Sequence, residues 1–185
     1  MGESWFVTGG ARSGKSGFAQ RLAASTGLEV VFIATLEALD EEMEIRIARH
    51  QAERPPEWLT IEAPLDPRRP LDVVSPEACV LLDCWSLWVS NRLLRLGGAP
   101  SADELTALET ELVREVDAIL EVQRARSGPL VSVSNEVGSG VVPDSVLGRA
   151  YRDLLGRVNQ RASASAERAW LLVAGRALEL PPPAS

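Results

Sequence analysis

The stretch Gly9-Gly10-Ala11-Arg12-Ser13-Gly14-Lys15-Ser16 fits the phosphate-loop pattern G-x-x-x-x-G-K-S. A pattern this short occurs by chance, so its weight depends on the sequence around it. Trp5-Phe6-Val7-Thr8 before it is a compact apolar run typical of a buried strand, and residues 17–25 after it have the apolar spacing of a helix. Strand, glycine-rich turn and helix is the order that a phosphate loop requires. The stretch therefore predicts a nucleotide-binding α/β fold.

The composition of the loop suits a phosphate ligand. Glycines at positions 9, 10 and 14 permit backbone angles closed to other residues, and the start of the following helix adds free N–H donors and partial positive charge. We expect the Lys15 ammonium to reach the β- and γ-phosphates and the Ser16 hydroxyl to bind a magnesium ion. The alternative is a glycine-rich turn that contains a lysine by chance. Lys15 is the only lysine among 19 basic residues, which favours a specific need for an ammonium group.

Length and composition predict one globular domain. A chain of 185 residues is long enough for a single domain with a full core, and 45% hydrophobic with 24% charged residues is ordinary for a folded protein. We expect one nucleotide-binding domain over residues 1–180, followed by a disordered tail at 181–185.

The charge pattern argues against several classes of partner. The net charge is −7, and the arginines are scattered among acids, which disfavours nucleic acid or an anionic membrane as a partner. No apolar run approaches the about 18 residues of a membrane span, and the chain enters its first strand without a leader, so we expect a cytoplasmic protein. Cys79 and Cys84 are five apart, which points them to opposite faces of a strand and predicts no disulfide.

Apolar runs and helical stretches alternate along the chain, and this alternation predicts an open, mainly parallel sheet with helices on both faces. A long, proline-rich connection at 54–76 contains one further short strand at 59–62. The predicted main strands are 5–8, 29–34, 78–83, 129–134 and 168–174, and the predicted helices are 17–25, 37–51, 85–96, 101–126 and 144–165.

Acidic and polar residues follow several of these strands. Residues 78–83 form a continuous apolar run that ends in Asp83, as expected of a Walker B strand whose acid holds magnesium or its water shell. The alternative is an aspartate that caps the next helix. The Walker B reading predicts that this strand lies beside the first strand or one strand away. Residues 135–143 (NEVGSGVVP) follow another strand and form either a site loop or a flexible turn.

The single histidine has two interpretations. His50 lies on the inward face of the predicted helix 37–51, in line with Leu39, Met43 and Ile47. A lone histidine on such a face is more often a packed core residue than a catalytic one. An imidazole with a pKa of about 6.5 is nevertheless mostly neutral at pH 7 and able to attack phosphorus.

Four stretches together resemble one family. They are VTGGARSGKS at 7–16, ARHQAERP at 48–55, SNEVGSGVVP at 134–143 and GRVNQR at 156–161. In these stretches the chain resembles the bifunctional adenosylcobinamide kinase/adenosylcobinamide-phosphate guanylyltransferases of cobalamin assembly. The phosphate loop alone is shared by a whole superfamily, whereas the other three stretches at these separations are far more specific.

The resemblance implies two reactions and a set of site residues. A nucleoside triphosphate, ATP or GTP, phosphorylates adenosylcobinamide; GTP then guanylylates the enzyme, and adenosylcobinamide phosphate accepts the GMP. The resemblance implies that His50 carries GMP and that Lys15 and Asp83 are the other catalytic residues. It also implies a RecA-like phosphate-loop fold and a trimeric assembly. The nucleotide-binding positions implied are Gly9, Gly10, Ala11, Arg12, Ser13, Gly14, Lys15, Ser16, Ala34, Thr35, Leu36, Gln51, Ala52, Glu53, Arg54, Glu62 and Asp83.

Two functions of other kinds remain open on the residues alone. A simple small-molecule kinase would use the loop and Asp83 and keep His50 as a structural residue. A nucleotide-sensing module would bind ATP or GTP and transfer nothing.

Overall fold

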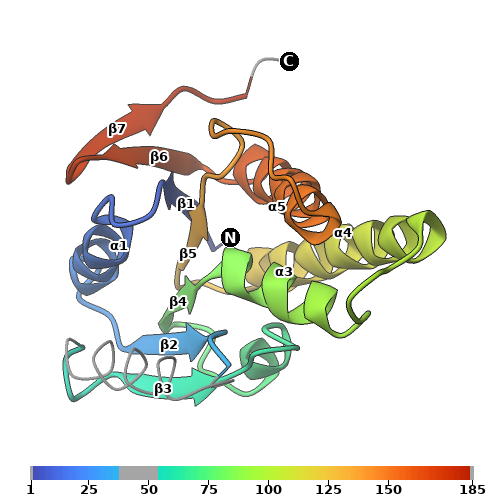
Figure 1. Cartoon of the computed structure of the whole chain (residues 1–185). Coiled ribbons are helices and arrows are strands. Elements are labelled where there is room, and N and C mark those ends of the chain that lie inside the picture. Colours follow the sequence, from blue (N-terminus) through green and yellow to red (C-terminus); the bar gives the residue numbers. More distant parts are fainter. Residues whose placement is uncertain (1, 38–53, 184–185) are drawn as a thin grey trace.

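The computed structural model describes residues 2–37 and 54–183, and in this part of the chain a seven-stranded sheet forms the centre of the molecule (Figure 1). The strand order is β3-β2-β4-β5-β1-β6-β7, and every pairing is parallel except that of β6 with β7. The strands are β1 (Ser4–Gly9), β2 (Val30–Ala34), β3 (Leu59–Glu62), β4 (Cys79–Asp83), β5 (Leu130–Asn135), β6 (Arg168–Val173) and β7 (Arg176–Leu180).

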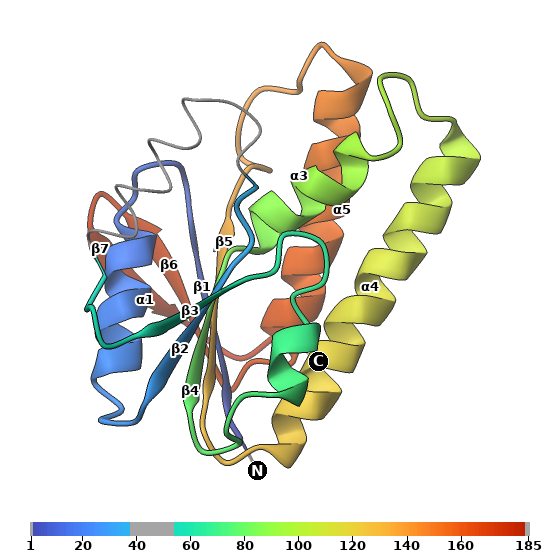
Figure 2. The ribbon, with the colours of Figure 1, turned by 90° about the horizontal axis from the view of Figure 1, so that it is seen from below.

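Helices cover both faces of the sheet, as predicted (Figure 2). One face packs against α1 (Lys15–Ala24), and the other against α3 (Trp85–Leu94) and α5 (Val146–Ala164), with α4 (Ala102–Ala125) packed on α5. Strands covered on both sides bury their whole length, which is why the four residues of β4 before Asp83 form an uninterrupted apolar run, all buried.

The strand order settles where the chain's two candidate nucleotide motifs lie. β5 alone separates β4 from β1, so the prediction that the Walker B strand lies one strand from the phosphate-loop strand is confirmed. The loops that follow β1 and β5 lie at the same edge of the sheet, at the top of Figure 2. In parallel sheets this carboxyl edge is where ligands bind.

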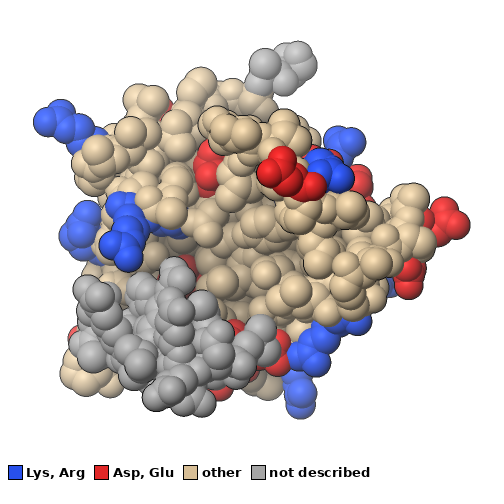
Figure 3. Space-filling model, in the orientation of Figure 1, with Lys and Arg blue, Asp and Glu red and all other residues tan. Residues whose placement is uncertain are grey.

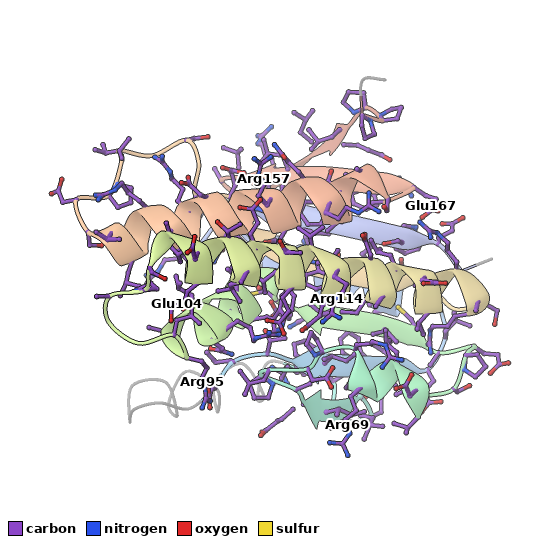
Figure 4. The ribbon with its side chains drawn as sticks, turned by 90° about the vertical axis from the view of Figure 1, so that its right-hand side faces the viewer. Arg69, Arg95, Glu104, Arg114, Arg157 and Glu167 are labelled. Atoms are coloured by element: carbon purple, nitrogen blue, oxygen red, sulfur yellow. The ribbon has the colours of Figure 1, made fainter. Side chains whose placement is uncertain are left out.

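Ion pairs join α4 to α3 and α5, and a capping box stabilises the start of α4. Arg157 on α5 pairs with Glu109 on α4 at 3.3 Å, and Arg92 on α3 pairs with Glu111 and Glu115 on α4, both at 2.7 Å. Ser101 and Glu104 form the capping box of α4. Figure 4 looks onto these helices, with Arg157 and Glu104 labelled. These contacts hold α4 against α3 and α5.

Two elements were not predicted. The 3-10 helix η1 (Arg69–Asp72) lies in the proline-rich connection, and β7 pairs antiparallel with β6 at the edge of the sheet. A two-residue turn joins β6 to β7, with positive φ at Ala174 (49°) and Gly175 (79°). β7 is almost wholly exposed and so lacks the apolar run that marks the inner strands. The predicted helix 37–51 lies outside the described residues except for its first residue.

The two cysteines correct one step of the sequence interpretation. Both are free, as predicted, and both are buried, but they pack in the apolar cluster on the α1 side of the sheet instead of on opposite faces. The alternation of faces holds only within a strand, and Cys84 already lies past the end of β4, at the N-cap of α3. Burial raises the pKa of the Cys84 thiol to about 12, so it stays neutral. No described helix is long and apolar enough to cross a membrane.

Candidate active site

The phosphate loop joins β1 to α1 and leaves the start of the helix open to a ligand. Gly14 is the N-cap of α1 with φ of 90°, a left-handed conformation that favours glycine, and no side chain caps the helix. The Lys15 ammonium folds back over the loop and donates to the Gly10 carbonyl at 3.1 Å. Uncapped first-turn N–H groups beside an ammonium are the donors that bind phosphate oxygens.

The turn between β6 and β7 packs against the phosphate loop. The Gly175 N–H donates to the Ser13 carbonyl at 2.9 Å. A Cβ on Gly14 would lie 3.3 Å from the Gly175 Cα, and a Cβ on Gly9 would lie 2.5 Å from the Leu172 carbonyl oxygen. These contacts, which the sequence interpretation missed, hold the loop in one shape; the only sequence signal for them is a glycine in an otherwise apolar region.

We expect Gly9→Ala to weaken nucleotide binding and to lower the melting temperature. The new methyl group would meet the Leu172 carbonyl of the backbone at 2.5 Å, so either β6 or the loop must shift. Isothermal titration with ATP and GTP and a thermal melt measure the two effects. Gly98→Ala is the control, because nothing lies within 4 Å of a Cβ at Gly98 and this glycine lies outside the phosphate loop. Equal nucleotide affinity in the two variants would contradict the assigned loop packing.

Asp83 lies at the end of β4, half-buried, in register with Ala34 of β2 and Val133 of β5. Its negative charge acts on groups from both sides. Burial lowers the pKa of Arg54, and the negative charge of Asp83 partly opposes this effect. Burial and the charge of Asp83 raise the pKa of Cys84, and the positive charge of Lys15 partly opposes that rise. Lys15 follows the end of β1, Asp83 ends β4, and Arg54 lies over Phe32 of β2, so the three charged residues lie near the carboxyl edge of the sheet.

Arg54 is held at this edge by its neighbours. Its guanidinium lies over the Phe32 ring at 3.5 Å from the centroid, and it donates to the Thr60 hydroxyl at 3.4 Å. Its buried Nε has no hydrogen-bond partner among the described residues. A guanidinium held at this edge, with its charge acting on Asp83, is a cation of the kind that binds phosphate groups.

The other predicted nucleotide positions fall into three groups. Ala34 and Leu36 are partly exposed at the end of β2, and Glu62 is exposed at the end of β3, in register with Ala34. Thr35 between them is fully buried. The positions His50, Gln51, Ala52 and Glu53 lie outside the described residues.

A network of polar side chains that the sequence did not predict lies at the carboxyl end of β5. Asn135 at the end of β5 donates to the Ser86 hydroxyl at 3.0 Å and accepts at its carbonyl from Asn159 at 2.9 Å. The Glu136 N–H donates to the Gly9 carbonyl at 3.0 Å. The start of the 135–143 segment is therefore anchored to the phosphate-loop strand, which favours a site loop over a loose turn.

The donor set fits magnesium in the way nucleotide enzymes bind it. The Ser16 hydroxyl and the Asp83 carboxylate are hard oxygen donors, which Mg²⁺ prefers. The described residues contain no group of three or more His, Cys, Asp or Glu that could hold a metal on their own. Such an ion would therefore need phosphate oxygens and water to complete its coordination.

A parallel sheet that carries a glycine loop, a lysine and an acid at one edge defines a phosphate-loop nucleotide-binding protein. The model of the CobU family, described as "Cobinamide kinase / cobinamide phosphate guanyltransferase", matches residues 5–180. The chain belongs to this family, as the four sequence stretches predicted.

Named relatives match along nearly the whole chain. The "Bifunctional adenosylcobalamin biosynthesis protein CobU" of Escherichia coli is 41% identical over 91% of this chain and 94% of its own length. The "Bifunctional adenosylcobalamin biosynthesis protein CobP" of Pseudomonas aeruginosa is 42% identical over 94% of this chain and 95% of its own. A RadB recombinase structure aligns with 91% of this chain and 73% of its own at 17% identity and a TM-score of 0.49. The fold assignment stands on the observed sheet order.

Proposed function

We propose that this chain is a bifunctional enzyme of cobalamin biosynthesis that phosphorylates adenosylcobinamide and then converts the product to adenosylcobinamide-GDP. The observation that carries the proposal is the family match over residues 5–180 together with Lys15 and Asp83 at one sheet edge. The space-filling view looks onto the carboxyl edge of the sheet; this face of the molecule is hollowed in its middle and largely uncharged to the right of the hollow (Figure 3). An open face suits a macrocyclic substrate that must reach the nucleotide.

In the kinase reaction, ATP or GTP binds with its β- and γ-phosphates in the loop of residues 9–16. The acceptor hydroxyl oxygen bonds to the γ-phosphorus while the bond between that phosphorus and the bridging β-phosphate oxygen breaks, the nucleoside diphosphate leaves, and the hydroxyl proton passes to water. Lys15 and the first amides of α1 bind the oxygens on which charge develops. Magnesium, held by Ser16 and Asp83, would neutralise phosphate charge.

In the second reaction, an imidazole nitrogen of His50 attacks the α-phosphorus of GTP and releases pyrophosphate. A phosphate oxygen of adenosylcobinamide phosphate then takes the GMP and frees the histidine. Both ends of the segment that holds His50 support this role. β2 ends at Ala34, next to Asp83 in the sheet, and Arg54 interacts electrostatically with Asp83, so the chain enters and leaves this segment at the nucleotide edge.

The remaining parts of the proposal rest on the family. Gln51, Ala52, Glu53, Arg54 and Glu62 contribute to the guanine nucleotide site, with residues 34–36. The enzyme acts as a homotrimer in the cytoplasm.

Incubation with adenosylcobinamide, magnesium and GTP, with product masses as the readout, tests the proposal. We expect both adenosylcobinamide phosphate and adenosylcobinamide-GDP. The phosphate alone would identify a simple kinase, and nucleotide binding without transfer would identify a sensing module. GTP labelled at the α-phosphate should leave label on the protein only if the guanylylation step occurs.

A further inference from the structure

Thr35 joins the ends of β2 and β4 through its hydroxyl group. The Thr35 side-chain oxygen accepts a hydrogen bond from the Cys84 N–H at 2.7 Å and donates one to the Cys84 carbonyl at 2.8 Å. The Thr35 N–H also donates to the Asp83 carbonyl at 3.1 Å. One buried residue therefore binds both sides of the peptide that links Asp83 to Cys84.

A second residue fixes Thr35 in turn. Asn91 on α3 is 5% exposed, and its side-chain amide donates to the Thr35 carbonyl at 2.8 Å and to the Pro64 carbonyl at 2.9 Å. Next to it, the Ala63 N–H donates to the Ala34 carbonyl at 2.8 Å. Thr35 is thus tied to β4, to α3 and, through Asn91, to the chain that follows β3.

The contact between Thr35 and Cys84 lies where the pairing of β2 with β4 ends. The parallel register of β2 and β4 ends at Ala34 and Asp83, and one residue later β4 gives way to α3, so backbone pairing stops where the site begins. The Thr35 hydroxyl replaces the missing pairing. Thr35 is 0% exposed, and its hydroxyl binds the protein backbone on both its donor and its acceptor side.

We propose that Thr35 is a positioning residue, whose hydroxyl fixes the Asp83–Cys84 backbone and thereby aims the Asp83 carboxylate at the nucleotide phosphates and their magnesium ion. The inference rests on the proposed function, because it assigns the metal role to Asp83. Residues that orient a metal-binding carboxylate typically change metal affinity or activity by about 10- to 100-fold when they are removed.

Thr35→Val tests the inference because valine keeps the shape of threonine and removes both hydroxyl hydrogen bonds. In the ligand-free protein we expect the Cys84 amide to exchange with deuterium about tenfold faster, since its partner is lost. In the kinase assay we expect the magnesium concentration for half-maximal rate to rise about tenfold. The KM for adenosylcobinamide should stay unchanged, because the acceptor does not depend on Asp83.

Three variants serve as controls. Thr35→Ser keeps the hydroxyl and should restore both the slow exchange and the parental magnesium requirement. Ser132→Ala removes another buried hydroxyl, in the middle of β5, and should change neither. If Thr35→Val does not fold, Asn91→Ala loosens the same strand end from the α3 side and should raise the magnesium requirement in the same direction.

The inference is overturned if Thr35→Val speeds exchange at Cys84 but keeps the parental magnesium requirement. It is equally overturned if exchange at Cys84 does not change, or if the rate falls with the magnesium requirement unaltered. Failure of the proposed function would look different. There, the parental protein itself would form no adenosylcobinamide phosphate from adenosylcobinamide, magnesium and nucleotide, whereas the exchange rate of the Cys84 amide in Thr35→Val would still be measurable.

Discussion

Lys15→Ala is expected to lower the kcat of adenosylcobinamide phosphorylation by at least about a hundredfold, the scale of loss when one group that stabilises transition-state charge is removed. Lys15 is the only lysine in the chain, and its ammonium lies over the phosphate loop, 3.1 Å from the Gly10 carbonyl. On nucleotide binding it would exchange part of that contact for the γ-phosphate, where charge develops as the phosphoryl group transfers. Alanine leaves the amides of the loop in place, so binding of the nucleotide should fall less than kcat.

The fold should survive this change. Lys15 is partly exposed in the first turn of α1, and alanine is the best helix former. Melting temperature and circular dichroism test this. Arg21→Ala is the matched control, because it removes an exposed cation from the last turn of the same helix, and it should keep the parental kcat. Phosphorylation by Lys15→Ala at near the parental rate would show that the lysine has no catalytic role and that the loop has been misassigned.

The fold was largely predictable because its inner strands carry a strong local signal. Strands buried on both faces are largely apolar, so β2 and β4 stand out in the sequence, and a glycine-rich loop marks the turn after β1. β5 gives a weaker signal, because it alternates apolar residues with two buried serines, Ser132 and Ser134. β7 has no such signal, since an exposed edge strand is under little pressure to be apolar. Its pairing with β6 follows from a tight turn at Ala174 and Gly175 that no periodicity reveals.

The site was predictable only at the level of its motifs. Lys15, Ser16 and Asp83 follow from residue type and position after a strand, which is local information. The support behind them is not local: Gly175 contacts Ser13 across more than a hundred residues of sequence, and Thr35 meets Cys84 only because β2 and β4 are neighbours. The family resemblance puts Thr35 among the nucleotide-binding positions, and the structure shows in addition that its side chain binds the protein backbone.

His50→Asn separates the two reactions most sharply. If His50 carries GMP, the variant should fold and still form adenosylcobinamide phosphate, because the kinase reaction uses Lys15, Ser16 and Asp83. It should neither retain label from α-labelled GTP nor form adenosylcobinamide-GDP, since only that reaction passes through a covalent intermediate. If His50 is instead a packed core residue, asparagine should lower the melting temperature and weaken both activities together.

The chemistry of the adduct supplies an independent readout. A bond between phosphorus and an imidazole nitrogen is labile in acid and stable in alkali, opposite to the behaviour of an acyl phosphate on Asp or Glu. Because His50 is the only histidine in the chain, a guanylyl-histidine found by peptide mass mapping can be assigned only to His50. Lys15→Ala provides the reciprocal control, with its phosphorylation lost while His50 remains in place to accept GMP if GTP still binds. Label that persists on the His50→Asn protein would refute the assignment of the carrier, and the guanylyl group would then have to be sought on another nucleophile.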